Sequence, residues 1–395
     1  MARAIKGREL RKMYEGLGAR ETVSLLREGF EAREFIPDDF SLRELAEHLV
    51  PDGREWISMM NPRHSGDGLL QEAAGVVDTA AFANITGQIV YSAMLERFQS
   101  PQFVFTPLVR NVPTQFSGEK IPGIGGIGDM AAIVPEGKPY PQVGLTEDWI
   151  NTPQTFKRGN IIPITKEAIF FDRTNQILDE ARKIGEYLGY NKETRIIDAF
   201  VDEGSTVHRY NWRNSIYATY QATTPWLNLK ASNALLDWTN LDAVEQLFNN
   251  MVDPNTGLPI LVMAQHLVVT PQLAHVAARI LNATSISLQS TGFATMGALT
   301  ATHAPNPVGN SQAFSAPYKL ITSRILPTRM ATDTSWFLGD IGKTVQYMEN
   351  FPLAVQQAPS NSEPEFTADI VMRFKASERG AAAVVEPRAT VKSTA

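Results

Sequence analysis

The segment from Ser117 to Glu203 constrains the fold of this chain more than any other part of the sequence. Its first part, residues 117–160, is interrupted repeatedly by proline and glycine and shows no helical period. Short strands at Met130–Val134 and Gln154–Lys157 would fit a two-stranded ribbon, and an isolated ribbon is barely stable in water. We therefore expect this arm to need a surface to lie on, and a neighbouring copy of the chain is the natural candidate.

A long amphipathic helix is predicted to follow the arm. Thr165 is expected to cap a first helical turn, and Asp172 or Thr174 to cap the main helix, which ends near Asp202 before Gly204. About 28 residues would span about 40 Å, which suits a structural strut. Apolar residues recur at steps of 4, 3 and 4, which places them on one face: Ile177, Ala181, Ile184 and Leu188.

The flanking regions predict further helices and strands. Before the arm, residues 1–50 read as charged helices that include a capping box at Ser41, and Asp78 is expected to cap a helix over Thr79–Gln99. After the long helix, residues 205–233 read as loop. The segments beyond that are predicted as a helix over Leu241–Val252 capped by Thr239, a buried strand over Leu261–Val269, a helix from Thr270-Pro271 to Leu281, strands at Tyr318–Ile325, Trp336–Gly339, Val345–Met348 and Glu365–Lys375, and a turn at Gly380 with a return strand over Ala381–Glu386.

Composition excludes several classes of protein. The chain has 395 residues, a net charge of −6 and no cysteine, so thiolate metal sites and disulfides are excluded and bulk charge does not favour duplex binding. No apolar run is long enough to span a bilayer. Residues 280–318 carry no charged side chain. This stretch is either a long surface loop or a surface that packs against copies of itself around a symmetry axis.

Motifs of enzyme chemistry are incomplete. The G-x-G-x-x-G match at residues 123–128 follows a proline and has no room for a helix before Pro135, so it does not predict nucleotide binding. Gly342-Lys343-Thr344 lacks the first glycine of a P-loop, because Phe337 stands there. The six histidines do not have metal-ligand spacing. We therefore predict no cofactor, no metal and no enzymatic activity.

Two groups of charged residues leave alternatives open. Glu136-Gly137-Lys138, near the outermost part of the arm, is either a solvated tip or a contact with a neighbouring subunit. The basic N-terminus is either a solvated helix face or a contact to nucleic acid or a scaffold partner: Arg3, Lys6, Arg8, Arg11 and Lys12.

In the order of its elements the chain resembles the major capsid proteins of tailed bacteriophages, which have the Hong Kong 97-like fold. The resemblance covers residues 75–395. Val134-Pro135-Glu136-Gly137 with Pro139 resembles the extended loop, and Gly159–Glu167 the approach to the spine helix. Three later segments resemble the strand-to-helix step of the axial domain, a late strand and the closing strand: Leu267–Leu273, Thr332–Asp340 and Gly380–Pro387.

The resemblance implies an α+β fold with a definite division of the chain. The implied parts are an N-terminal helical extension, scaffold-like or an internal arm (1–72), an N-arm (73–116), an extended loop (117–160), a peripheral domain with the spine helix (161–232), an axial domain (233–350) and peripheral return strands (351–395). It implies extended-loop contacts at Glu136, Lys138, Tyr140 and Trp149, axial contacts at Thr291, Phe293, Asn306 and Asn310, and Lys138 as the candidate for a crosslink.

The function implied is a head protein that assembles into hexamers and pentamers of an icosahedral shell around double-stranded DNA. Its partners would be copies of itself, portal, scaffold and decoration proteins, and packaged DNA contacted non-specifically, with no membrane. Its location would be the virion, assembled in the host bacterial cytoplasm. The alternatives are an encapsulin-like nanocompartment shell and an enzyme with an unrecognised site.

Overall fold

The structure is a computed structural model that describes residues 7–50, 54, 57, 79–123, 134–137, 148–204, 209–212, 215–223, 225–253, 256–283, 285–288, 302–305, 318–358 and 370–395. Its α-helices are α1 (Gly7–Leu17), α2 (Ala19–Glu31), α3 (Leu42–Leu49), α5 (Thr79–Phe98), α6 (Lys166–Phe170), α7 (Thr174–Val201), α8 (Trp238–Asn250), α9 (Ala274–Asn282) and α10 (Ile341–Thr344). Short 3-10 helices lie at η1 (Pro37–Asp39), η2 (Thr106–Leu108), η3 (Leu326–Arg329) and η4 (Pro387–Ala389).

The strands belong to several sheets. They are β1 (Arg110–Pro113), β2 (Lys120–Pro122), β3 (Trp149–Asn151), β4 (Phe156–Thr165), β5 (Arg209–Trp212), β6 (Ser215–Tyr217), β7 (Leu229–Lys230), β8 (His266–Val269), β9 (Ser285–Leu288), β10 (Thr302–Pro305), β11 (Lys319–Thr322), β12 (Trp336–Gly339), β13 (Val345–Gln357), β14 (Ile370–Val384) and β15 (Thr390–Ser393). The predicted α+β class is confirmed.

The chain divides into two compact units, and α7, β13 and β14 contribute residues to both. Unit 1 contains Met1–Pro101, Lys157–Asn191 and Phe351–Arg379. Unit 2 contains Gln102–Phe156, Lys192–Asn350 and Gly380–Ala395. Each unit has hydrophobic clusters of its own.

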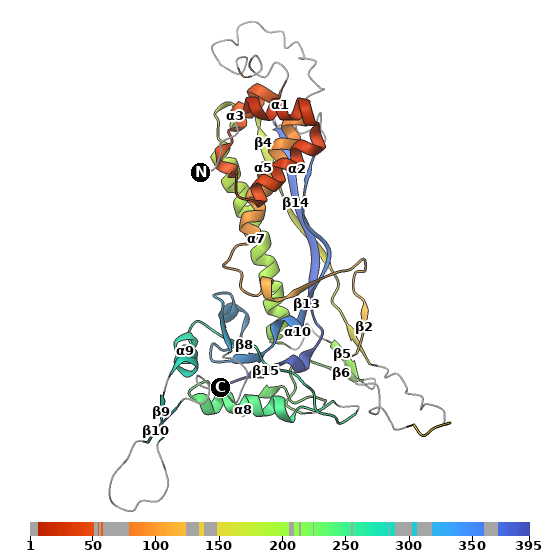
Figure 1. Cartoon of the computed structure of the whole chain (residues 1–395), viewed down its shortest axis with the longest axis vertical. Helices are drawn as coiled ribbons and strands as arrows, with labels where there is room; N and C mark the ends of the chain where they lie inside the picture. Colours follow the sequence, from red (N-terminus) through yellow and green to blue (C-terminus); the bar gives the residue numbers. More distant parts are fainter. Residues whose placement is uncertain are drawn as a thin grey trace, which may run out of the picture. The chain divides into compact units, whose positions relative to one another are not determined.

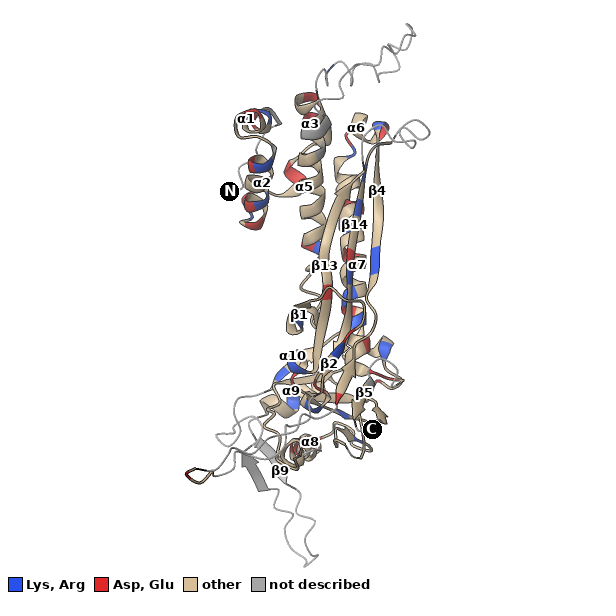
Figure 2. Ribbon diagram, turned by 90° about the vertical axis from the view of Figure 1, so that its right-hand side faces the viewer, with Lys and Arg blue, Asp and Glu red and all other residues tan. Residues whose placement is uncertain are grey.

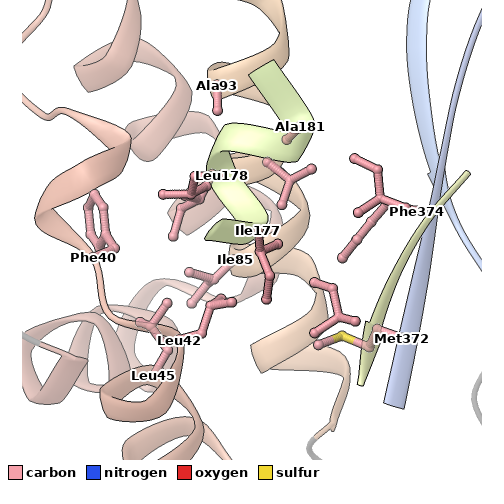
Figure 3. Close-up of a cluster of buried hydrophobic side chains, with 14 of the residues drawn as sticks. Phe40, Leu42, Leu45, Ile85, Ala93, Ile177, Leu178, Ala181, Met372 and Phe374 are labelled. Atoms are coloured by element: carbon pink, nitrogen blue, oxygen red, sulfur yellow. The ribbon is translucent and has the colours of Figure 1, made fainter. Parts of the chain in front are cut away.

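The core of unit 1 joins the N-terminal helices to α5 and to the first part of α7. Helices α3 and α5 lie beside the first part of α7 (Figure 1). Leucines of α3 pack in one cluster with Ile85 of α5 and with the predicted apolar face of α7 (Figure 3). Met372 and Phe374 of β14 complete this cluster from the sheet side (Figure 3). The described N-terminal helices therefore contribute to the core of unit 1.

Helix starts and helix contacts in unit 1 follow from particular side chains. Ser41 caps α3 by accepting from the Glu44 amide, and Thr165 caps α6 by accepting from the Ala168 amide, as predicted. Gly185 lies where α7 meets α5, because a Cβ there would come within 2.2 Å of the Met94 carbonyl oxygen. The glycine lets the two helices approach closely.

One carboxylate connects the starts of α3 and α7. Asp172, with φ at +50°, accepts hydrogen bonds at Oδ1 from the hydroxyls of Ser41 at 2.8 Å and Thr174 at 2.9 Å. The Leu42 amide donates to the Thr174 hydroxyl at 2.8 Å. Thr174 is therefore the first residue of α7 and part of this junction, whereas the sequence suggested it as a cap.

Unit 2 is built around a five-stranded sheet with the order β11-β8-β12-β15-β7. β8 pairs in parallel with β11 and antiparallel with β12, and β12 pairs antiparallel with β15. Helices α8 and α9 contribute to the cluster on one side of this sheet, which includes Trp336 and Val391. The second half of α7 contributes to another cluster, in which the Phe200 and Phe337 rings are 4.9 Å apart.

Several predicted boundaries are wrong. The buried strand expected over Leu261–Val269 begins only at His266. The cap of α8 is Asp237, so Thr239 lies inside the helix. Helix α9 begins at Ala274 rather than at Pro271, and the Thr270 hydroxyl donates to the Asp333 carbonyl instead of capping it. Residues 205–233, expected as loop, contain β5, β6 and β7.

The prediction of a C-terminal hairpin that turns at Gly380 is also wrong. β14 continues through Gly380 to Val384 without turning. The glycine is required because a Cβ at this position would lie 2.6 Å from atoms of the Tyr347 ring. The sequence pattern at Gly380 indicates a turn. In the structure this glycine instead allows close packing against the Tyr347 ring. The strands at Lys319–Thr322 and Trp336–Gly339 confirm predictions.

Candidate assembly surfaces

The base of the arm is a paired structure within its own chain. β2 and β3 pair antiparallel, and β3 pairs with β5, in a sheet with the order β2-β3-β5-β6. These strands differ from the ribbon strands predicted at Met130–Val134 and Gln154–Lys157. Residues 130–133 lie outside the described residues, and Phe156 and Lys157 are the first residues of β4. The expectation that the arm lacks support in its own monomer is therefore wrong for its base.

The two ends of the arm are held together tightly. The Gly123 amide donates to the Asp148 carbonyl at 2.8 Å, and a Cβ on Gly123 would approach the Asp148 Cβ to 2.2 Å. At the opposite end of the β2–β3 pair, the Glu119 amide donates to the Thr152 hydroxyl at 2.8 Å, and the Thr152 amide donates to the Glu119 carbonyl at 3.0 Å. These hydrogen bonds, which we call the clamp, join β2 to β3 and fix where residues 124–147 start and end.

An aromatic cluster supports this clamp. Ile150 of β3 packs with Tyr210 and Trp226, whose rings are 5.0 Å apart in an edge-to-face arrangement. The Tyr210 hydroxyl donates to Asp148 at 3.4 Å, and the Trp226 indole donates to the Thr219 carbonyl at 3.0 Å. The base of the arm is consequently anchored by buried side chains.

The residues expected to make extended-loop contacts are placed in two ways. Glu136 is exposed in a turn with Gly137, whose φ is +80°. Trp149 is half-buried in β3, and the ammonium of Lys120 lies 4.7 Å from the centre of its ring. Lys138 and Tyr140 lie outside the described residues.

The expected axial contacts Thr291, Phe293, Asn306 and Asn310 also lie outside the described residues, as do Arg3 and Lys6. Arg8 lies in α1. Arg11 forms an ion pair with Glu15 at 2.8 Å and donates to the His48 carbonyl at 3.3 Å, while Lys12 is exposed. Acidic and basic residues are interleaved on α1 and α2 (Figure 2). The described part of the N-terminus is therefore of mixed charge rather than a basic patch.

A group of charged residues in α7 was missed. Glu193 is fully buried, and its carboxylate accepts from the Phe105 amide at 2.7 Å, the Thr106 amide at 2.7 Å and the Thr106 hydroxyl at 2.6 Å. Arg195 donates to the Tyr347 hydroxyl and the Gly380 carbonyl, both at 2.9 Å. The nearly buried Lys192 lies 3.4 Å from Glu349.

A signal for two of these residues was present in the sequence. The apolar face of α7 advances by 4, 3 and 4 residues to Leu188, and the same steps continue to Lys192, Arg195 and Ala199. Two cations therefore follow the buried face of the helix, and buried cations require partners. The second half of α7 is fixed in unit 2 by polar contacts to η2, β13 and β14.

No group of three or more metal-ligating side chains occurs among the described residues. At α10 the Asp340 carboxylate accepts from the Gly342 and Lys343 amides, so an anionic side chain already occupies the amides that a phosphate would need. None of the described helices is long and apolar enough to cross a membrane.

Comparison with known proteins identifies the family. The model of a family described as phage capsid protein matches residues 150–393, more than half of the chain. No curated protein sequence matches.

Similar solved structures include the SrpI encapsulin complex from Synechococcus elongatus PCC 7942, at 13% identity over 74% of this chain and 87% of that chain, with a TM-score of 0.43. A structure of Gordonia phage Cozz is similar at 16% identity over 83% and 98% of the two chains, with a TM-score of 0.41. The capsid of Cyanophage P-SCSP1u is similar at 16% identity over 73% and 86%, with a TM-score of 0.41.

The family match runs from β3 through α7 and the five-stranded sheet to β15. The mixed helix and sheet elements within it follow the order predicted for the Hong Kong 97-like fold: the long α7, then the α/β part formed by α8, β8 and α9, then the late strand β12. The chain therefore belongs to the phage capsid protein family, as its sequence predicted.

Proposed function

We propose that this capsid protein acts by self-association, with many copies forming hexamers and pentamers that close into an icosahedral shell around double-stranded DNA. The observation that carries this proposal is the match of the phage capsid protein family over residues 150–393. The role is mechanical, and weak contacts repeated over many copies give a persistent shell. Such a shell would be assembled in the host cytoplasm and would remain in the virion.

The arm would supply one contact between subunits. A backbone hydrogen bond between Gly123 and Asp148 holds its two ends together, so residues 124–147 start and end at neighbouring positions. The exposed Glu136 supports a contact at its turn. Lys138 and Tyr140 would take part in the same contact between subunits. The accessible part of the Trp149 ring, beside Lys120, would also take part in it. Unpaired strand edges of a neighbouring copy would receive the arm by β-augmentation.

The remaining contacts follow from the domain division implied by the family resemblance. Residues 233–350 would meet their copies at the centre of each ring, with Thr291, Phe293, Asn306 and Asn310 in the contact. The exposed Lys12 would contribute to a weak contact of the N-terminal helices with DNA or a scaffold protein. Portal and decoration proteins would bind the assembled shell rather than the single subunit.

Electron microscopy of the purified protein, combined with light scattering, tests the proposal. We expect closed shells of megadalton mass. A monomer that stays monomeric under all assembly conditions would contradict it. Shells that enclose a protein cargo and no DNA after production in cells with the neighbouring genes would support the nanocompartment alternative.

The role of residues 124–147 can be tested while the β2–β3 pair at the base of the arm is kept. Because Pro122 pairs with Trp149, and Gly123 is bonded to Asp148, residues 124–147 can be replaced by an Asn-Gly turn that closes a β2–β3 hairpin. We expect a folded subunit that no longer assembles. A control variant carries a Gly/Ser segment of the original length, and we expect it to fail in assembly as well. Normal shells from the hairpin variant would refute the role of the arm.

A further inference from the structure

The segment that precedes β8 has an unusual distribution of apolar side chains. Residues 260–265 alternate between two sides: Ile260, Val262 and Ala264 pack against the cluster formed with α8 and α9. The intervening Leu261 and Met263 point away from it and are 94% and 61% exposed. A solvated side of an extended segment normally carries polar residues, as this one does at Gln265, so the exposed Leu261 and Met263 need another explanation.

This segment is held in place although it exposes apolar side chains. Val252 and Pro259 form a β-bridge on either side of a turn. The Asp253 amide donates to the Leu258 carbonyl at 2.8 Å, and the Ile260 amide donates to the Met251 carbonyl at 3.1 Å. Val252 and Leu258 lie in this hairpin and are also exposed, at 46% and 38%. We call Val252, Leu258, Leu261 and Met263 the apolar strip.

The acidic and basic side chains that neighbour the apolar strip along the chain are few, and they are buried. From Met251 to Val269 the sequence contains one acidic residue, Asp253, and one residue that can become basic, His266. Asp253 is buried and lies 3.7 Å from the buried guanidinium of Arg388, which also binds Glu386 through two hydrogen bonds. A surface that meets identical surfaces around a symmetry axis must avoid repeating like charges. The apolar strip satisfies this condition.

Two backbone amides of the strip have no backbone partner among the residues that the structure describes. Within the described part of the chain, no hydrogen bond joins the amide of Leu261 or of Met263 to another backbone group. Edges of this kind accept an additional extended chain. Apolar side chains and an open backbone edge therefore occur on the same short, fixed segment.

We propose that the apolar strip is a contact between copies of this chain, buried when the subunits assemble. This inference rests on the proposed function and adds to it a defined surface in unit 2. The occupant is a second copy, because the chain belongs to a capsid protein family, the strip is apolar and uncharged, and interface cores are depleted of charge and rich in such residues. The position of the strip is fixed before assembly, so the contact needs little reordering of this segment.

The absence of cysteine from the chain gives a direct test, because each introduced thiol is unique. Leu261→Cys and Met263→Cys are labelled with a maleimide before and after assembly of the full-length protein, and the modified fraction is read by mass spectrometry. Leu236→Cys, at a side chain that is 70% exposed outside the strip, is the matched control, and Ala277→Cys, at a buried side chain, is the unreactive reference.

We expect the labelling rates at 261 and 263 to fall by about tenfold or more on assembly, as for side chains in an interface core, while position 236 stays reactive. Unchanged reactivity at 261 and 263 in assembled shells would overturn the inference and leave the proposed function standing. Equal protection of 236, or thiols at 261 and 263 that are already unreactive in the free subunit, would also overturn it. If the wild-type protein forms no shells, the proposed function itself fails.

A charge placed in the strip provides a second readout. Leu261→Glu changes an exposed side chain, so the free subunit should keep its circular dichroism and thermal midpoint. We expect this variant to remain unassembled because the glutamate would be desolvated in the contact. Leu236→Glu is expected to assemble. Shells formed by Leu261→Glu at the wild-type yield would contradict the contact.

Discussion

At the scale of single residues, Glu193 links α7 to the segment that leads into β1. Its buried carboxylate accepts three hydrogen bonds from Phe105 and Thr106, two of them from backbone amides. No other carboxylate position on the described part of α7 is buried to this degree. A buried polar group that loses its partner costs free energy, so the stability of this connection depends on one side chain.

Replacement of Glu193 should therefore be costly. We expect Glu193→Ala to lower the free energy of unfolding by about 3 kcal/mol, because the buried Phe105 amide and the part-buried Thr106 amide lose their acceptor. Glu193→Gln should have a smaller effect, since its amide oxygen can still accept. Urea denaturation of unassembled subunits measures both, with the exposed Glu186→Gln of the same helix as the control. Equal stability of Glu193→Ala and wild type would show that these hydrogen bonds contribute nothing.

A second residue-scale prediction concerns pH. Burial raises the pKa of Glu245 above its usual value of 4.5, Asp242 adds to the rise, and the hydrogen bond from Tyr318 opposes it. Burial, with the neighbouring Glu245 carboxylate, likewise raises the pKa of Tyr318 above its usual range. Because the folded-state pKa of Glu245 is raised, its stabilising contribution is present below the unfolded pKa and is lost as pH rises through the folded value.

Glu245→Gln removes this titration. We expect the variant to gain stability relative to wild type as the pH is raised from 4 towards neutrality, since only the wild type must then ionise a partly buried carboxyl. Thermal unfolding of both proteins across this range measures the difference. A stability difference that is independent of pH, or that changes in the opposite direction, would disprove the assignment.

At the scale of elements, the junction of α3 and α7 shows how the N-terminal segment is attached. Asp172 Oδ1 accepts hydrogen bonds from the Ser41 and Thr174 hydroxyls. The Arg182 guanidinium of α7 donates a hydrogen bond to the Asp38 carboxylate at 2.8 Å. Behind these polar contacts, the helices share one apolar cluster (Figure 3). Both kinds of contact make α3 a structural partner of the long helix.

Asp172 can be tested with a matched pair of substitutions. Asp172→Ala removes both hydrogen bonds and places alanine at a positive φ, so we expect a loss of about 1 kcal/mol at this exposed site. Asp172→Asn keeps the acceptor oxygen and tolerates this backbone conformation, and should be nearly neutral. Calorimetry of the two variants distinguishes them. If both lose the same stability, the hydrogen bonds are not what holds the junction.

At the scale of the whole molecule, distant parts of the chain depend on each other through the sheets. β15, at the C-terminal end of the chain, lies between β12 and β7 in the five-stranded sheet, and all four of its residues are buried. The Asn233 amide donates to the Thr394 carbonyl at 2.7 Å, and the Thr394 amide donates to the Lys230 carbonyl at 2.9 Å. The C-terminal residues therefore complete the sheet of unit 2.

Truncation after Ala389 should prevent unit 2 from folding, because it removes an interior strand and leaves the edges of β12 and β7 unpaired. We expect this variant to be insoluble, whereas removal of Ala395 alone should have no effect. Soluble yield and near-ultraviolet circular dichroism are the measurements. A folded, soluble protein ending at Ala389 would show that β15 is dispensable.

The sequence by itself determined the elements whose signals are local. The step pattern of α7, the caps at Ser41 and Thr165 and the strand at Trp336–Gly339 depend on neighbours within a few residues, and all were predicted. The family was also visible, since the order of elements persists where single motifs are weak. For the candidate contact surfaces, the resemblance implied contacts at Glu136 and Trp149, which remain predictions, whereas the hydrogen bond between Gly123 and Asp148 was not predicted.

Only the tertiary structure decided which strands pair and which side chains are buried. β3 has its partner β5 more than fifty residues away, and the role of Gly380 depends on the Tyr347 ring. Such contacts carry no local period, because a strand of three or four residues is stabilised mainly by what it packs against. The exposure of Leu261 belongs to the same class: an apolar residue in an alternating segment faces the core or the solvent according to the register that the rest of the fold imposes.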